Sequence, residues 1–382
     1  MESTAGFKNT VHRKRMVGLW PRLKGTLLYG LATAGLGAMP LAAQAMPSIK
    51  AISAGNGFSM ALAQGGEVWV WGDNGHGQLG NDGPSSPIPL QVPGLSGITA
   101  ISAGDGHFLA LARNGTVWGS GKNATGQLGD GTTDDHDSPV QIPGLNGITA
   151  IAAGDGHSLA LARDGTVWAW GDNQAGELGD GSTTDHHSPV KVLNLNRITA
   201  IAASNGFSLA LARDGTVWAW GANGRGELGI DSWDGQDSPV KVHDLTSITA
   251  IATGNSHALA LAQDGTVWIW GDFQTTPVQV SGLSGITAID AGGGHSLALG
   301  GDGTVWAWGN YDNGALGDGT TDNHDSPIKV PGLPGIQAIS TGFYDTFACA
   351  RDGSVWGWGW NDHGALGDGT DTERDSPVRI VP

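Results

Sequence analysis

The chain of 382 residues contains 65 Gly and 16 Trp and has a formal net charge of −17, a composition far from that of an average globular protein. Charge divides sharply along it, because residues 1–45 carry six basic side chains and one acidic one, whereas the remainder carries 13 basic and 35 acidic ones. Such an acidic body repels phosphate backbones and anionic lipid headgroups, so we exclude nucleic acid as a partner of the folded part.

Residues 1–45 have the layout of a secretory signal peptide or N-terminal targeting segment. A basic region is followed by an apolar stretch over residues 26–43 and by the small-x-small pattern Ala43-Gln44-Ala45. We expect export with cleavage after Ala45, a secreted, periplasmic or cell-surface location, and no membrane attachment afterwards. The alternative is a retained membrane anchor, which Pro40 and the many small residues disfavour. Translation from Met16 would give a signal of more usual length.

From residue 49 the chain repeats itself about every fifty residues. The phrase Ile-Thr-Ala-Ile opens at Ile98 and returns in later units, with one short unit after Ile248. A period of this length indicates supersecondary units that bury their apolar faces only by stacking on neighbours. We divide residues 46–382 into seven units, namely 49–97, 98–147, 148–197, 198–247, 248–285, 286–335 and 336–382.

Each unit contains four predicted strands, named A to D in chain order. In the third unit they are ITAIAAG, HSLALAR, TVWAWG and SPVKV, with apolar side chains alternating along B and C. Asp164-Gly165 separates B from C, and Asp-Gly, Asn-Gly or Gly-Gly recurs there in every unit as a hairpin turn. We therefore predict an all-β fold, a seven-bladed β-propeller with four antiparallel strands per blade. Strand A, rich in Ala and Gly, suits the crowded axis, and strand D, with Pro and Lys, suits an exposed edge.

Thirteen of the 16 Trp lie in the repeated Val-Trp-x-Trp-Gly pattern of strand C or its one-Trp variant. Repetition at one position of every unit predicts packing between adjacent sheets. A stacking platform for sugars or bases is the alternative, and it requires rings that face solvent.

This pattern resembles the regulator of chromosome condensation repeat family, whose units read much like G-H-S-L-A-L, D-G-T-V-W-A-W-G, N-x-x-G-x-L-G-D-G and S-P-V. The resemblance covers residues 49–382 and implies a seven-bladed propeller. It also implies several functions, since the founding member is an exchange factor for a nuclear GTPase that binds chromatin, others are scaffolds or ligase modules, and some secreted bacterial relatives inhibit β-lactamases. Family rings commonly complete one blade with strands from both chain ends. Here unit one starts at strand A and unit seven ends at strand D, so we expect closure by side-chain packing.

Catalytic residues are hard to find in the repeats. His107, His157, His257 and His295 occupy the same A-to-B turn, whereas a catalytic histidine is normally singular, so we expect them to stabilise the turn. Cys349 stands where other units have Leu and is interpreted as a small core side chain. We expect no enzyme activity and no cofactor.

Acidic C-to-D loops raise the question of calcium. Carboxylates at this spacing could ligate the ion through hard oxygens, but the ordered spacing of a calcium loop is missing, and Asp also bonds its own backbone in turns. We expect no metal site, and we expect the histidines of these loops, His136, His186, His187 and His324, to be solvated. The calcium candidates, should the ion bind, are Asp130, Asp134, Asp137, Asp318, Asp322 and Asp368.

The A-to-B turns and C-to-D loops should emerge on one face of the ring. The fifth unit has lost twelve residues there, and aromatic residues that do not repeat gather in units four to seven. Repeated residues are explained by packing and unrepeated ones are not, so we predict a protein-binding patch, although some of these rings could instead tuck under neighbouring loops. The patch comprises Trp233, Phe273, Tyr311, Phe343, Tyr344 and Trp360.

Three function classes follow. The leading one is an exported, monomeric, non-enzymatic propeller that binds a protein partner through this loop face. The second is guanine-nucleotide exchange on a small GTPase, which the resemblance suggests and an export signal disfavours. The third is a hydrolase or lyase that uses the central channel, which would need acids or bases converging at the axis.

Overall fold

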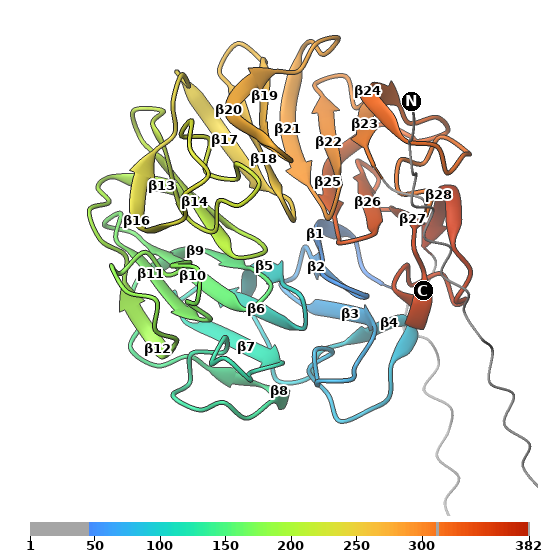
Figure 1. Cartoon of the computed structure of the whole chain (residues 1–382). Coiled ribbons are helices and arrows are strands. Elements are labelled where there is room, and N and C mark those ends of the chain that lie inside the picture. Colours follow the sequence, from blue (N-terminus) through green and yellow to red (C-terminus); the bar gives the residue numbers. More distant parts are fainter. Residues whose placement is uncertain (1–45, 311–312, 381–382) are drawn as a thin grey trace, which may run out of the picture. The chain divides into compact units, whose positions relative to one another are not determined.

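The computed structural model describes residues 46–310 and 313–380. They form seven four-stranded antiparallel sheets, each with the strand order of the chain, arranged side by side around a common axis (Figure 1). The prediction of a seven-bladed propeller with four strands per blade is confirmed. The turn η1 (Asp362–Gly364) is a single 3₁₀ turn, and no helix within the described ranges is long and apolar enough to cross a membrane.

The first strand of every blade, strand A, lies at the axis. These strands are β1 (Ile49–Ala54), β5 (Ile98–Ala103), β9 (Ile148–Ala153), β13 (Ile198–Ala203), β17 (Ile248–Thr253), β21 (Ile286–Ala291) and β25 (Ile336–Thr341). The B strands follow and are almost wholly buried. They are β2 (Phe58–Ala63), β6 (His107–Ala112), β10 (His157–Ala162), β14 (Phe207–Ala212), β18 (His257–Ala262), β22 (His295–Gly300) and β26 (Asp345–Ala350).

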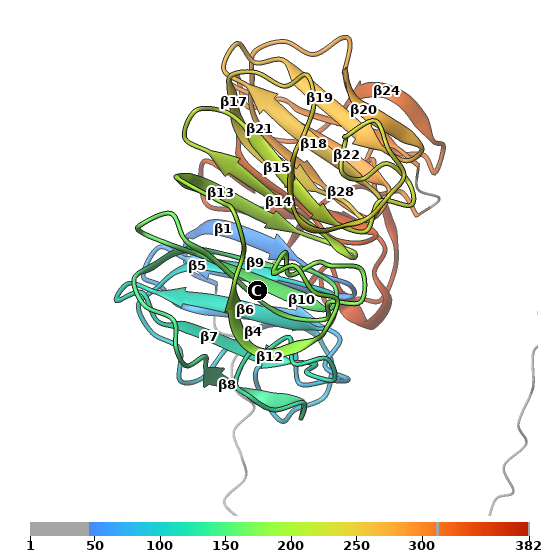
Figure 2. The same ribbon diagram turned by 60° about the vertical axis from the view of Figure 1, so that its left-hand side comes forward.

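The C and D strands complete each blade toward the rim. The C strands are β3 (Val68–Gly72), β7 (Val117–Gly121), β11 (Val167–Gly171), β15 (Val217–Gly221), β19 (Val267–Gly271), β23 (Val305–Gly309) and β27 (Val355–Gly359). The D strands are β4 (Ser86–Gln91), β8 (His136–Gln141), β12 (His186–Lys191), β16 (Gln236–Lys241), β20 (Gln274–Gln279), β24 (His324–Lys329) and β28 (Arg374–Ile380). In the turned view of Figure 2, blade 4 (β13–β16) lies between its neighbours, blades 3 and 5.

The ring closes by side-chain packing between blades 1 and 7, as expected from the arrangement of the strands. Ile49, Trp71 and Phe347 share one buried cluster, and the rings of Trp71 and Phe347 meet edge to face at 6.0 Å. The indole Nε1 of Trp71 donates to the carbonyl of Ala365 at 2.8 Å. Closure therefore uses the same contacts as most of the other junctions between blades, and no strand is shared between the chain ends.

The two Trp positions of strand C differ in burial. The second Trp of the pattern is buried at the junctions between blades, and the first is mostly half-buried. The packing role predicted for these residues therefore applies most strictly to the second position, whose indoles also donate hydrogen bonds.

The repeated histidines bridge neighbouring blades. The Nε2 atom of His107 lies 2.8 Å from Ser158 Oγ in the next blade, and His157, His257 and His295 make the equivalent contacts with Ser208, Ser296 and Thr346. Because the Ser158 hydroxyl donates to the carbonyl of Gln127, His107 must donate from Nε2. Burial lowers the pKa of His107 to about 4 and that of His157 to about 3, which keeps both rings neutral. These residues tie neighbouring blades together, as expected for a structural role.

Candidate functional site

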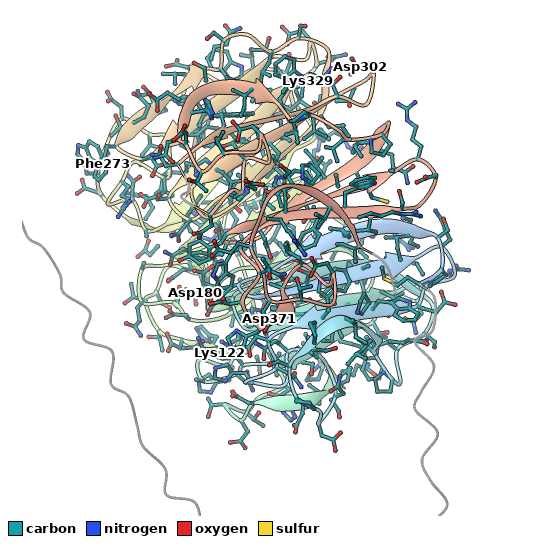
Figure 3. The ribbon with its side chains drawn as sticks, turned by 90° about the vertical axis from the view of Figure 1, so that its right-hand side faces the viewer. Lys122, Asp180, Phe273, Asp302, Lys329 and Asp371 are labelled. Carbon is teal, nitrogen blue, oxygen red and sulfur yellow. The ribbon has the colours of Figure 1, made fainter. Side chains whose placement is uncertain are left out.

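The A-to-B turns and C-to-D loops lie on the same face, called here the loop face. The first residue after each C strand donates its backbone N–H to the A-to-B turn of its own blade, as Asp172 does to Gly156 at 2.9 Å. The Asp-Gly hairpins and the links to the next blade meet on the opposite face, where Ile98 N donates to Gly66 O. In Figure 3, Phe273 of a C-to-D turn and Asp302 of a hairpin project on opposite sides.

Five of the six full-length C-to-D loops are each built around one asparagine, which is half-buried in blade 1 and buried in blades 2, 3, 4 and 7. In blade 3, Asn173 Oδ1 accepts the N–H of Leu178 at 2.9 Å, while Asn173 Nδ2 donates to the carbonyls of Ser182 and Thr184. Asn74, Asn123, Asn223 and Asn361 accept the N–H of the equivalent leucine in the same way. One side chain therefore fixes the whole loop and directs its Leu into the core.

The loop of one blade covers the strand C of the next. In blade 3, the carbonyl of Glu177 accepts a hydrogen bond from Trp220 Nε1 of blade 4 at 2.7 Å, and Leu178 joins the buried cluster that contains Trp220. The same carbonyl-to-indole bond recurs at four other junctions, through Trp71, Trp170, Trp270 and Trp358. Between blades 1 and 2, Ser120 replaces the Trp, and its hydroxyl lies 3.0 Å from Gly77 O of the loop and 2.7 Å from His136 O of its own blade.

Blade 5 has no such loop. Gly271 pairs with Gln274, so only Asp272 and Phe273 connect strands β19 and β20, whereas residues 172–185 connect the equivalent strands of blade 3. Both turn residues have left-handed backbones, with φ of 47° and 73°. A two-residue hairpin of this kind favours Asn-Gly, because a side chain at positive φ is strained. Phe273 thus occupies a position where glycine would adopt the same backbone conformation at a lower cost in free energy.

Phe273 and Trp233 are the two most exposed large apolar side chains among the described residues, at 68% and 52%. The Phe273 ring lies against the guanidinium of Arg225 from blade 4, 5.4 Å from its centroid, and the Phe273 N–H donates to Arg225 O. Trp233 belongs to the same blade 4 loop as Arg225. The structure therefore places two exposed aromatic side chains on adjoining loops.

The blade 7 aromatics form a separate group. Tyr344 lies between Phe343 and Trp360, with ring centroids 5.2 and 5.6 Å apart, and all three are half-buried. The Trp360 ring also covers the turn at Gly57 of blade 1. These rings pack over the closure of the ring, in line with the alternative that some aromatics tuck under neighbouring loops. Tyr311 lies outside the described residues.

A cavity of about 280 Å³ opens at the axis on the loop face. Asp105, Asp155 and Asp290 line it together with backbone and small side chains of all seven blades. Asp105 accepts hydrogen bonds from Asn56 Nδ2 at 2.7 Å and Lys122 Nζ at 3.2 Å, and Asp290 accepts the N–H and hydroxyl of Thr341. Asp155 has no side-chain partner in the described ranges, so acids that the repeats did not reveal do reach the axis.

Burial raises the pKa values of two of these carboxyls. The pKa of Asp155 rises to about 7, with the negative charge of Asp105 as a second cause, and that of Asp290 rises to about 6. A group with such a pKa can exchange protons near neutrality. However, Asp290 accepts hydrogen bonds from Thr341, and Asp105 is paired with Lys122. Asp155 is therefore the one carboxyl of the three without a side-chain partner among the described residues, whereas general acid–base catalysis commonly uses two carboxyls.

The acidic loops use their carboxylates internally. Asp130 accepts the N–H of Thr132 and contacts His136 Nε2 at 2.8 Å, Asp318 does the same with Thr320 and His324, and Asp368 pairs with Arg374. The expectation of solvated histidines was wrong for His136, His186 and His324, each of which lies within 3.0 Å of an Asp six residues earlier. No group of three or more acidic, His or Cys side chains is placed to hold a metal ion within the part of the chain that the structure describes. Geometry gives no support to calcium at Asp134, Asp137 or Asp322.

Comparison with known proteins places these features in a family. Residues 29–275 match the RCC1-like domain, and residues 302–349 and 352–382 match the regulator of chromosome condensation (RCC1) repeat. No curated protein sequence matches the chain.

Among solved structures, Prp20p from Saccharomyces cerevisiae, described with its binding to Gsp1p and histones, superposes with a TM-score of 0.75 at 25% identity, over 82% of this chain and 85% of Prp20p. Yeast RCC1 (Prp20) bound to Kap60 gives 0.74 at 24% identity, over 82% and 83% of the two chains. Human WBSCR16 gives 0.72 at 23% identity, over 78% and 85%. The chain therefore belongs to the family of RCC1-like domains built from RCC1 repeats.

Proposed function

We propose that this protein is an exported, non-enzymatic propeller that captures a protein partner on its loop face. The observation that carries the proposal is Phe273, a bulky apolar side chain that is 68% exposed and held at a φ of 73°. Exposure and a left-handed backbone each cost free energy, and neither contributes to packing. Large aromatics that become buried in a complex are typical centres of protein interfaces.

The surroundings of Phe273 fit recognition of a protein. Arg225 is exposed beside the ring, and Trp233 projects from the same blade 4 loop. Tyr, Trp and Arg are the residue types that most often dominate interface energetics. The acidic body favours partners with a basic surface, because opposite charge accelerates their encounter. The export component rests on the sequence of residues 1–45.

The experiment immobilises the chain, identifies captured proteins by mass spectrometry and measures the affinity of the leading one for variants. Phe273→Ala and Trp233→Ala should each weaken binding at least tenfold. Leu193→Ala is the matched control, because Leu193 is an apolar side chain with 41% exposure on the rim of blade 3. Unchanged affinity in both aromatic variants would refute the aromatic site.

Nucleotide exchange on a GTPase is the second candidate, and the likeness to Prp20p favours it. Release of labelled GDP from a panel of small GTPases, with and without the chain, tests it directly. Catalysis in the axial cavity has weaker support, because, within the described residues, Asp155 is the one carboxyl there without a side-chain partner and has no second free carboxyl beside it. Loss of a measured hydrolase or lyase activity in Asp155→Asn would be needed to revive that alternative.

A further inference from the structure

The junction between blades 5 and 6 lacks the loop that covers the other six junctions. At five of those junctions a loop carbonyl accepts the indole N–H of the next blade, and at the sixth the loop carbonyl of Gly77 lies 3.0 Å from the Ser120 hydroxyl. Trp308 occupies the equivalent position in blade 6, and its Nε1 has no hydrogen-bond partner in the described part of the chain. Trp308 is 4% exposed, while the five paired indoles belong to residues with no measurable exposure.

The missing loop also removes an apolar side chain. Leu178, Leu228, Leu316 and Leu366 each join the cluster that contains the indole of the next blade. The clusters around Trp170 and Trp308 contain no loop leucine, but the loop beside Trp170 still supplies the fully buried Leu128, whereas the blade 5 turn has no leucine. At the position where blades 3, 4 and 6 have Ala, blade 5 has the larger residue Ile269. This larger side chain fills part of the space and still stays partly exposed, whereas Ala169, Ala219 and Ala307 are fully buried.

Strand β20 beside Ile269 is exposed in the same way. Val278 pairs with Ile269 and is 42% exposed, and Val280 is half-buried where the equivalent residues of all other blades are buried. We call Ile269, Val278, Val280 and Trp308 the open junction. Ile269 and Val278 lie on the two strands that the Asp272-Phe273 turn joins, so the exposed aromatic and the exposed apolar strand edge belong to the same blade.

We propose that the open junction binds a turn of a partner protein that presents a leucine preceded by a free backbone carbonyl, in place of the missing loop. The six complete junctions define this occupant, because in each of them the chain itself inserts a residue–Leu–Gly turn. The Leu side chain would cover Ile269 and Val280, and the preceding carbonyl would accept from Trp308 Nε1. This inference rests on the proposed function, and it names the kind of partner segment that the loop face takes.

Blade 6 also offers a backbone carbonyl that would accept a hydrogen bond from the bound turn. In blade 3 the loop N–H of Gly181 donates to Asp237 O of the next blade, and Gly131, Gly319 and Gly369 make the same contact at other junctions. The carbonyl of Asp325 holds the equivalent position in blade 6, and no loop donor reaches it within the described residues. A bound turn would therefore both accept from Trp308 and donate to Asp325, which fixes its direction.

A second copy of this chain does not fit as the occupant. The six loop leucines, which are Leu79, Leu128, Leu178, Leu228, Leu316 and Leu366, are all at most 1% exposed in their own blades. Presenting one of them to another copy would open a complete junction in order to close an incomplete one. The loop leucines of a second copy therefore do not fit, and we take the partner to be a different protein with an exposed Leu turn.

The test uses a peptide with the sequence of residues 172–185, cyclised through added terminal cysteines, because those residues form a complete loop. Cyclisation lowers the entropy cost of binding, and Cys349 is buried and will not exchange with the disulfide. The readout is the ¹⁵N-labelled indole signal of Trp308, assigned with Trp308→Phe. We expect a saturable shift of that signal, and at least tenfold weaker binding when Asp replaces the leucine of the peptide.

Two variants of the chain complete the test. Replacing Asp272-Phe273 with residues 172–185 fills the junction from within and should abolish peptide binding. Ile269→Asp, a single change at a partly exposed position, should weaken it at least tenfold, and Leu193→Asp should leave it unchanged. No shift of Trp308, equal binding of the Asp-containing peptide, or undiminished binding to the filled chain would overturn the proposal.

Failure of this inference can be told apart from failure of the proposed function. The peptide titration needs no natural partner, and partner capture is tested through Phe273 and Trp233. If the peptide does not bind while Phe273→Ala reduces capture, the open junction is wrong and the aromatic site stands. If the peptide binds while both aromatic variants capture the partner normally, the aromatic site is wrong and the open junction stands.

Discussion

The junction between blades 3 and 4 and the junction between blades 5 and 6 start from nearly the same strands and end with different surfaces. In the first, Leu178 and the Glu177 carbonyl enclose Trp220 completely. In the second, a two-residue turn leaves Trp308 without that carbonyl and Ile269 partly exposed. The strands therefore form the ring and the C-to-D loops cover its junctions, so that omitting one loop leaves apolar side chains partly exposed without disturbing the fold.

The largest expected effect separates the two indoles. Trp220→Ala should lower the free energy of unfolding by about 3–5 kcal/mol, because it removes a buried ring and one of the two hydrogen bonds that the Glu177 carbonyl accepts, the other coming from Ser208 Oγ. Trp308→Ala should cost about 1 kcal/mol less, since no hydrogen bond is lost. Urea unfolding followed by circular dichroism measures both. Equal losses would mean that the junctions are energetically alike.

The apolar residues of the two junctions give a second, smaller contrast. Leu178→Ala should cost about 2–4 kcal/mol, as expected for a fully buried leucine. Ile269→Ala should cost roughly 1–2 kcal/mol, because part of that side chain is already in water and because alanine is the residue that blades 3, 4 and 6 carry there. The same urea unfolding measurements test this contrast. A loss of unfolding free energy in Ile269→Ala larger than about 2 kcal/mol would show that Ile269 is an ordinary core residue.

A third prediction concerns the junction between blades 7 and 1, where Asp345 stands in place of the bridging histidine. Its carboxyl is 1% exposed and has no side-chain hydrogen-bond partner among the described residues, and burial raises its pKa well above 3.8. The native state thus holds a proton that the unfolded state has released, so stability falls as pH rises from about 4 toward the native pKa. Asp345→Asn should remove this loss, with a gain of about 1–3 kcal/mol at pH 8 and less at pH 4.

Thermal unfolding at pH 4, 6 and 8 checks the Asp345 prediction. Asp352→Asn is its control, because Asp352 is an exposed hairpin residue of the same blade. A gain that is independent of pH would contradict the assignment of a buried, protonated carboxyl.

The smallest expected effect lies in the blade 5 turn itself. Phe273→Gly should raise the free energy of unfolding by about 1 kcal/mol, because glycine adopts a φ of 73° without strain. The same variant should weaken partner capture, a combination that marks a residue kept for function at the expense of stability. Unchanged or lower stability on calorimetry would show that the Phe273–Arg225 contact matters more than the strain.

Much of the fold could be predicted from the sequence, because the repeat period, the Asp-Gly turns and the alternating strands are local signals. The blade 5 deletion was also visible, and it pointed to Phe273. The bridging role of His107 and the loop-building role of Asn173 were not recognised, since their partners lie in other blades or other parts of a loop and no local pattern names them. The acids at the axis were missed for a related reason, because Asp290 stands on strand A and Asp155 on a turn, and only ring closure brings them together.

The most direct measurement of the open junction is hydrogen exchange of the indole N–H groups in the free protein. The six indoles to compare are those of Trp71, Trp170, Trp220, Trp270, Trp308 and Trp358. We expect Trp308 to exchange at least ten times faster than the other five, because no carbonyl of the described residues accepts its N–H. Exchange of Trp308 as slow as that of Trp220 would mean that its junction is already closed, and the central claim would be contradicted.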